Sequence, residues 1–483
     1  MAEGQAAGEQ AAETPTKDPL EPIPLIEGRQ SPESLTASLL QPIQRKPGRV
    51  WWSLFFLTLG GTALFFTAIT VTFVRGVGAW GNNIPVAWAY GIIDFVWWIG
   101  FGHAGTLISA ILVLFQQKWR ASVNRFAEAM TLFAVMQAGL FPLLHLGRPW
   151  VAYWLVPYPS TMRVWPNFRS SLPWDMVAIT TYFTVSLLFW YLGLIPDLAA
   201  ARDRATTRRR QFWYGLASLG WTGSARHWHH WKTGYLLLAG LATPLVLSVH
   251  TIVSFDFAIA QLPGWHSTIF PPYFVAGAIF SGLALVLTLL IPTRKPLGLD
   301  HVITDKHLDI ICKLLMATGM MVGYGYLQEH FFAWYSGDEY EMAAYAYKRT
   351  GGWAWLFWYQ LFSNVLVPQL FWFAKLRTNV VVVWLAAVAV DIGMWVERFT
   401  IIVPPLSHDF LPKSWEWYSP TWVDWSLLGG SMCFFGWLFL LFLKFVPPVS
   451  ISEVKELHHE LKEALEHQEQ VRRTESLLPE KGA

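Results

Sequence analysis

The sequence predicts an all-α integral membrane protein with about ten transmembrane helices. Hydrophobic residues make up 54% of its 483 residues and charged residues only 14%, which is too apolar for an ordinary soluble domain. The 29 Trp, 33 Phe and 16 Tyr are typical of chains whose aromatic rings lie at membrane–water interfaces. Ten apolar segments are long enough to cross a hydrocarbon core about 30 Å thick at about 1.5 Å per helical residue.

The chain begins with a polar segment, residues 1–50, which is rich in Glu, Gln, Pro, Thr and Ala. This composition buries too little apolar surface to offset chain entropy, so we expect a disordered cytoplasmic tail. No apolar stretch precedes Trp51, so the first span is expected to direct membrane insertion. The predicted spans of the membrane domain, residues 51–446, are 51–74, 86–115, 126–146, 173–196, 232–260, 270–292, 308–333, 352–374, 379–402 and 425–446.

The last 37 residues, 447–483, begin with two prolines and are predicted to form a cytoplasmic amphipathic helix and tail. Ser450 and Glu453 have the spacing of a capping box. Apolar residues follow at helical spacing: Val454, Leu457, Leu461 and Leu465. We interpret this helix as an element that lies on the surface or contacts another subunit.

Lys and Arg are distributed unevenly between the two sets of loops. The richer set holds Arg45, Lys46, Arg49, Lys118, Arg120, Arg125, Arg202, Arg208, Arg209, Arg210, Arg226, Arg294, Lys295, Lys375 and Arg377. The sparser set holds Arg75, Arg148, Arg163, Arg169, Lys348, Arg349 and Lys413. Because positively charged short loops stay on the cytoplasmic side, both termini are predicted to be cytoplasmic.

Ionisable groups inside the spans carry the functional information. Each costs about 2.5–3.5 kcal/mol at the bilayer centre unless it is paired or hydrated. The predicted topology places most of them toward the non-cytoplasmic half: Asp94, His145, Asp175, His250, Asp256, Glu329, His330, Glu397 and Arg398. His103 and Asp391 lie nearer the middle. This shared depth indicates a polar cavity near the outer surface, although for any single residue neutralisation by Arg398 is an alternative.

The sequence gives little indication of a bound metal or haem. Cys312 and Cys433 are the only cysteines, so the chain lacks the ligands for a four-cysteine iron–sulfur cluster. A haem bound between two spans needs two His at the same depth in the membrane. We expect His103 and His250 to differ in depth by about 10 Å, which does not fit such a pair. The cluster of His227, His229 and His230 is interpreted as an interfacial or partner contact. A net charge of +2 gives no indication of nucleic-acid binding.

Two motifs resemble those of a known family. The stretch 144–150, Leu-His-Leu-Gly-Arg-Pro-Trp, resembles the motif that closes the third span in the NrfD-like, or polysulfide-reductase (PsrC-like), membrane subunits. The stretch 393–399, Gly-Met-Trp-Val-Glu-Arg-Phe, is similar to the version in ActC subunits of bacterial alternative complex III. With Asp175 two residues after Pro173, the resemblance covers about residues 50–446.

The resemblance implies two four-helix bundles, 86–260 and 270–402, with two flanking helices. It also implies a subunit of a respiratory complex in a bacterial cytoplasmic membrane, without a redox centre of its own. Such a subunit oxidises menaquinol or ubiquinol near the periplasmic side and passes electrons to an iron–sulfur partner, alongside other membrane and cytochrome c subunits. The resemblance assigns the quinol role to His145 and Asp175, the first-choice catalytic pair. Depth alone adds Asp256, His250 and Arg398 as quinol-binding candidates.

The remaining candidates, Asp94, His103, Asp391, Glu397, Glu329 and His330, are interpreted as parts of a proton pathway. Three alternatives stay open. The first is that the chain is a redox-silent structural subunit. The second is that it is a quinone-linked anchor of a polysulfide- or nitrite-type reductase. The third is a secondary transporter, which should show paired Gly/Pro-broken spans, and these are not evident in the sequence.

The charge asymmetry of the loops predicts the outcome of cysteine labelling in intact cells. A cysteine in the variant Ser160→Cys should react with a membrane-impermeant thiol reagent, whereas one in Ala205→Cys should not. Labelling of the second variant but not the first would invert the topology.

Overall fold

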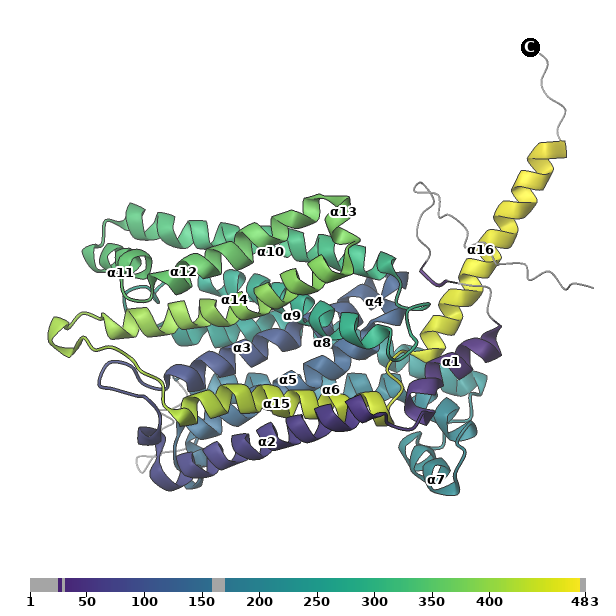
Figure 1. The fold of residues 1–483 in the computed structure, drawn as a ribbon, viewed down its shortest axis with the longest axis horizontal. Helices are drawn as coiled ribbons and strands as arrows, with labels where there is room; N and C mark the ends of the chain where they lie inside the picture. The colour runs from purple at the N-terminus through teal and green to yellow at the C-terminus, as the bar shows by residue number, and fades with distance from the viewer. Residues whose placement is uncertain (1–24, 28–30, 159–169, 478–483) are drawn as a thin grey trace, which may run out of the picture.

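The chain folds into a bundle of long helices. The computed structural model describes residues 25–27, 31–158 and 170–477, and these residues contain no strand. The long helices lie side by side along the long axis of the molecule, with α1 and α16 together at one end (Figure 1). We call this the α16 end and the other the far end. The architecture is that of an all-α, multi-pass integral membrane protein, as predicted.

Nine helices within the described ranges are long and apolar enough to span a membrane. They are α2 (Arg49–Arg75), α3 (Ala89–Thr106) continued by η2 (Leu107–Ile111) and α4 (Leu112–Leu114), α5 (Asn124–His145), α6 (Ser171–Asp203), α8 (Ala225–Ala258), α9 (Phe270–Arg294), α10 (Asp305–Ser336), α14 (Val380–Ser407) and α15 (Trp422–Phe445). The elements outside the spans are α1 (Pro32–Gln44), η1 (Val77–Ala79), η3 (Lys118–Ser122), η4 (Pro149–Leu155), α7 (Arg208–Ala217), α11 (Glu339–Thr350), η8 (Pro412–Ser414) and the long polar helix α16 (Ile451–Leu477).

The predicted span 352–374 is helical but interrupted. It consists of α12 (Ala354–Leu361), a π-helical turn η6 (Phe362–Leu366) and a 3-10 turn η7 (Val367–Trp372), followed by α13 (Ala374–Arg377). Pro368 removes one backbone donor from this segment, and the side chain of Asn364 bonds to Tyr326 of α10 instead of facing solvent. Changes of helix type of this kind are common at functional positions.

The helix contacts can be described in two groups. In the first, α3 packs on α5, α5 on α6, α6 on α8 and α8 on α3. In the second, α9 packs on α10 and α14, and α12 packs on α14. Contacts of α9 with α3 and α8 join the two groups, while α2 and α15 pair with each other at the side.

The prediction of a disordered tail over residues 1–50 is wrong for its last part. Residues 32–44 form α1, which packs on α16 and α15 and buries Leu35, Leu39, Leu40 and Ile43. Composition alone did not indicate this helix because its few leucines need a docking surface supplied by residues 400 positions away. Residues 1–24 and 28–30 lie outside the described residues.

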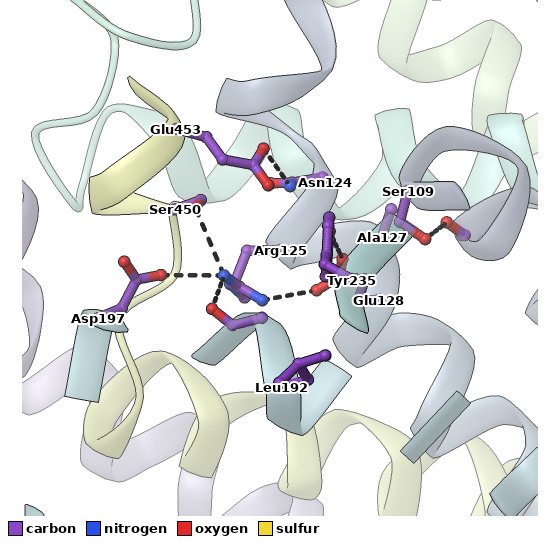
Figure 2. Close-up of polar contacts among 12 residues, drawn as sticks. Ser109, Asn124, Arg125, Ala127, Glu128, Leu192, Asp197, Tyr235, Ser450 and Glu453 are labelled. Atoms are coloured by element: carbon purple, nitrogen blue, oxygen red, sulfur yellow. Dashed lines mark hydrogen bonds and ion pairs between the residues drawn. The ribbon is translucent and has the colours of Figure 1, made fainter. Parts of the chain in front are cut away.

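A buried ion cluster holds the α16 end together (Figure 2). Arg125 is fully buried and pairs with Glu128 at 2.8 Å and with Asp197 of α6 at 2.9 Å. Tyr235 of α8 donates to Glu128 at 3.1 Å. The cluster therefore ties α5, α6 and α8 to one another, and Arg125 is not the solvated loop charge that the sequence suggested.

The same cluster caps α16. Asp197 Oδ1 accepts from the backbone N–H groups of Ile451 and Ser452 at 3.1 and 3.2 Å, which satisfies two free donors at the start of that helix. The capping box expected between Ser450 and Glu453 is replaced by contacts to distant residues. Arg125 donates to Ser450 at 3.4 Å, and Glu453 pairs with Arg120 at 2.9 Å.

Removing the capping carboxylate should loosen α16 from the bundle. We expect Asp197→Ala to leave Arg125 buried with one carboxylate fewer, at a cost of about 3 kcal/mol, and to speed hydrogen exchange over residues 451–457. The control Glu456→Ala removes an exposed pair with Lys232 at 2.8 Å and should not change exchange there. Unchanged exchange in Asp197→Ala would contradict the capping role.

Candidate functional site

A cavity of about 360 Å³ lies at the far end of the first group of helices. This is the size of a small-molecule site, typically about 300–1,000 Å³. Most of the lining is apolar and includes Ile92, Phe95, Pro142, Trp265 and Leu406. The ionisable residues on the wall are His145, Asp175 and Asp256, three of the predicted site residues.

His145, the last residue of α5, lies among aromatic rings. Its imidazole stacks on Trp88 with centroids 5.7 Å apart and meets Trp80 and Phe95 edge-on at 6.3 and 6.2 Å. Nε2 is buried and has no hydrogen-bond partner within the part of the chain that the structure describes.

Asp175 and Asp256 form the polar side of the cavity. Asp175 lies in the first turns of α6 and Asp256 near the end of α8, and these helices pack on each other. Their carboxyl groups lie against one another, and Ser171 lies beside Asp256. Among the described residues, Asp175 Oδ1 has no partner. Asp175 thus pairs with Asp256 and not directly with His145.

His250 lies away from this cavity, in contact with His103. The two ring centroids are 4.5 Å apart, so the expectation of about 10 Å of depth between them is wrong. That expectation placed each span centre at the middle of its apolar run, whereas α8 extends to Ala225, outside the apolar segment. Rings in contact leave no space for a haem between them. Within the described chain, no group of three or more His, Cys, Asp or Glu is arranged to hold a metal ion.

Arg398 also lies outside the cavity. Its guanidinium pairs with Glu397, the residue before it, and covers the ring of Phe274 at 5.0 Å. The carboxylate partner of Arg398 is thus the adjacent residue of the same helix and not a residue of another span. Glu397 also accepts from Tyr326 of α10, which accepts from Asn364 in the interrupted helix at 2.8 Å. Phe274 separates Arg398 from His250, whose ring lies 5.8 Å from it.

Glu329 and His330 line a second, much smaller cavity with the buried Lys348 of α11. The ammonium of Lys348 lies 4.5 Å from the ring centroid of Tyr345. Burial lowers the pKa of Lys348, and the negative charges of Glu329 and Glu341 oppose this shift. Sequence reasoning indicated Glu329 and His330 but treated Lys348 as a loop charge.

Asp94 and Asp391 each have one hydrogen-bonded carboxyl oxygen. Asp94 of α3 accepts from the indole of Trp395 at 3.0 Å, and Asp391 accepts from Thr288 at 2.7 Å. Their other oxygens are buried without a partner among the residues described. Neither residue lines the 360 Å³ cavity.

Sequence reasoning missed the aromatic enclosure of His145. Trp80 and Trp88 precede α3 by a few residues, and a chain with 29 Trp gives no signal that separates these two from interfacial anchors. Their positions depend on the conformation of a loop in which Trp88 has a φ of 60°. No residue pattern in the sequence predicts this conformation. Gly91 belongs to this enclosure for a packing reason that only the structure shows, because a Cβ there would lie 2.6 Å from the Trp80 ring.

The fold and the site define a class: a multi-pass helical membrane protein whose buried cavity carries an imidazole and two carboxyl groups. The family model described as "Polysulphide reductase, NrfD" matches residues 79–407. Because this match covers more than half of the chain, the protein belongs to the NrfD family.

Several membrane proteins of other organisms are similar to this chain. The putative membrane subunit of a dimethyl sulfoxide reductase from Halobacterium salinarum is 28% identical over 48% of this chain and 51% of its own length. The chain thus spans about half of that relative. A selenate reductase subunit from Mesobacillus selenatarsenatis is 21% identical over 77% of this chain and 88% of its own. The Hdr-like menaquinol oxidoreductase integral membrane subunit of Archaeoglobus fulgidus is 22% identical over 75% and 82%.

The buried pair of Arg398 and Glu397 should control stability. We expect Arg398→Leu to leave Glu397 buried without a cation and to lower the free energy of unfolding by about 3–5 kcal/mol, and Glu397→Gln in that background to recover part of the loss. Thermal unfolding of the purified protein measures this. The control Lys313→Leu, which removes a half-exposed pair with Asp309, should cost at most about 1 kcal/mol. Wild-type stability of Arg398→Leu would mean that the guanidinium reaches water.

Proposed function

We propose that this protein is a quinol-oxidising membrane subunit of a multi-subunit oxidoreductase, with the quinol bound in the 360 Å³ cavity. The observation that carries this proposal is the cavity wall, where an apolar surface is joined by His145 and Asp175, whose Nε2 and Oδ1 are buried without a hydrogen-bond partner among the described residues. A quinol is a flat apolar ring with one hydroxyl at each end, so it needs this combination.

Quinol oxidation releases two protons and two electrons and leaves a quinone. A neutral imidazole at His145 can accept the proton of one hydroxyl. Two carboxyl groups that lie against each other, as Asp175 and Asp256 do, favour sharing one proton over carrying two negative charges, so the pair can take up one more, from the other hydroxyl. Two protons therefore find acceptors on the chain, and the two electrons leave for an acceptor in a partner subunit.

The names of the relatives support a quinone-linked role. The Archaeoglobus fulgidus protein is a menaquinol oxidoreductase subunit, and the integral membrane subunit of a menaquinone reductase from Nitratidesulfovibrio vulgaris is 36% identical over 16% of this chain. We propose menaquinol as the substrate on this ground. The partners would be an iron–sulfur subunit and further membrane and cytochrome c subunits.

Within the family, we propose alternative complex III as the assembly. The support is the resemblance of the stretch 393–399 to the ActC version of that motif. The far end of the bundle would then face the periplasm of a bacterial cytoplasmic membrane, with α1 and α16 in the cytoplasm. The dimethyl sulfoxide and selenate reductase subunits among the relatives favour a second candidate, the quinol-oxidising anchor of a terminal reductase, which uses the same site.

We further propose that the remaining buried groups serve proton translocation. The first candidates are the contacting rings of His103 and His250 and the hydrogen-bonded groups of Glu397, Tyr326 and Asn364. The apolar ring of Phe274 lies between His250 and Arg398. Asp94, Asp391, Glu329 and His330 are further candidates.

Loss of either proton acceptor should abolish quinol oxidation without loss of assembly. We expect His145→Ala and Asp175→Asn to lower the rate at least about 10²-fold, the scale for loss of a general base, in complexes with intact clusters. The rate with a short-chain naphthoquinol measures the effect. Artificial donors that reduce the clusters directly should still support turnover.

His229→Ala and Asp203→Asn are matched controls, because both side chains are exposed at the α16 end, and they should oxidise quinol at wild-type rates. Assembled His145→Ala and Asp175→Asn complexes with wild-type rates would contradict the proposal and favour a structural subunit.

A further inference from the structure

Trp88 has a backbone conformation that large side chains rarely adopt. Its φ is 60°, and the other non-glycine residues with positive φ among those described, Gln116 and Leu219, lie in loops at the α16 end. A bulky residue in the left-handed region is an outlier. Such strain persists only where surrounding contacts fix it, and it concentrates at functional sites.

Hydrogen bonds on both sides of Trp88 fix its loop. The N–H of Gly81 donates to Asp424 of α15 at 2.8 Å, and Asn83 accepts from the N–H of Val86 at 2.8 Å. After Trp88 its own carbonyl accepts from Ile92 at 2.9 Å, which starts α3. The loop therefore brings Trp88 to the cavity at the expense of local strain.

The indole of Trp88 lies beside His145 on the cavity wall. It stacks on the imidazole at an interplanar angle of 26° and also lines the cavity. Trp88 is 38% exposed, much more than Trp80 at 2%, so part of its surface is open to a bound molecule. The stack, with Trp80 and Phe95 at the edges, fixes the imidazole plane.

We propose that Trp88 is the positioning and specificity residue of the quinol site. This proposal rests on the proposed function. Trp88 holds the imidazole of His145 in the plane set by their stacking and offers its bicyclic face to the quinol ring. The stabilisation that offset stacking of two aromatic rings provides grows with the area that the rings share. A naphthoquinol can cover both rings of the indole, whereas a benzoquinol covers one. The site therefore prefers naphthoquinols, and Trp88 is the source of that preference.

The test compares variants at this position in the purified complex, with one short-chain naphthoquinol and one short-chain benzoquinol. Trp88→Gly should raise KM for the naphthoquinol about 10-fold and for the benzoquinol less than about 3-fold. It should unfold at the same temperature as wild type or a higher one, because glycine adopts positive φ without strain. Trp88→Phe should keep kcat within about 3-fold and lose part of the preference.

The matched control is Leu219→Gly, which relieves the same kind of strain at φ 48° in an exposed loop. It should not change KM for either quinol. If Trp88→Gly does not assemble, Trp88→Leu and Trp88→Phe carry the test, since both keep a side chain but only Phe can stack.

Wild-type KM values in Trp88→Gly, an equal rise for both quinols, or the same preference in Trp88→Leu and Trp88→Phe would overturn the proposal. These outcomes leave the proposed function standing as long as His145→Ala is inactive. Wild-type oxidation by His145→Ala would instead remove the proposed function itself.

Discussion

Ionisable side chains between apolar helices have no water to solvate them, so each must find a partner within the protein. This constraint explains the polar contacts of the bundle. Arg125 has two carboxylates, Arg398 has Glu397 and the Phe274 ring, and Asp197 takes up the backbone donors of α16. These contacts join helices far apart in sequence, so the same groups that are costly to bury also determine how the helices assemble.

Several atoms depart from that rule, including one carboxyl oxygen each of Asp94 and Asp391, and two of them belong to the cavity at the far end. These two, His145 Nε2 and Asp175 Oδ1, lack a partner in the described part of the chain, although the His145 ring stacks on Trp88 and Asp175 lies against Asp256. A site that fixes one end of a polar group and leaves the other without a partner is arranged for a ligand that supplies the missing hydrogen bonds. The strained loop at Trp88 adds a second local cost at the same place.

Much of the fold followed from length and apolarity, since those properties alone determine which segments can cross a membrane. His145, Asp175 and Asp256 came together because the ends of antiparallel spans meet at one depth. Contacts across helices were less predictable. The pairing of Arg398 with Glu397 depends on rotamers, the contact of His103 with His250 depends on how far α8 extends, and α1 depends on a distant surface. None of these is encoded locally, so a residue pattern could not reveal them.

The central claim is that quinol binds in the cavity beside His145, and photolabelling tests it most directly. A naphthoquinone carrying a photoreactive group would be irradiated with the purified complex, with and without excess unlabelled quinone, and the modified peptides identified by mass spectrometry. The account predicts protectable labelling in peptides that contain Trp88, His145 or Asp175. Protectable labelling confined to the second cavity, around Glu329 and Lys348, would contradict it.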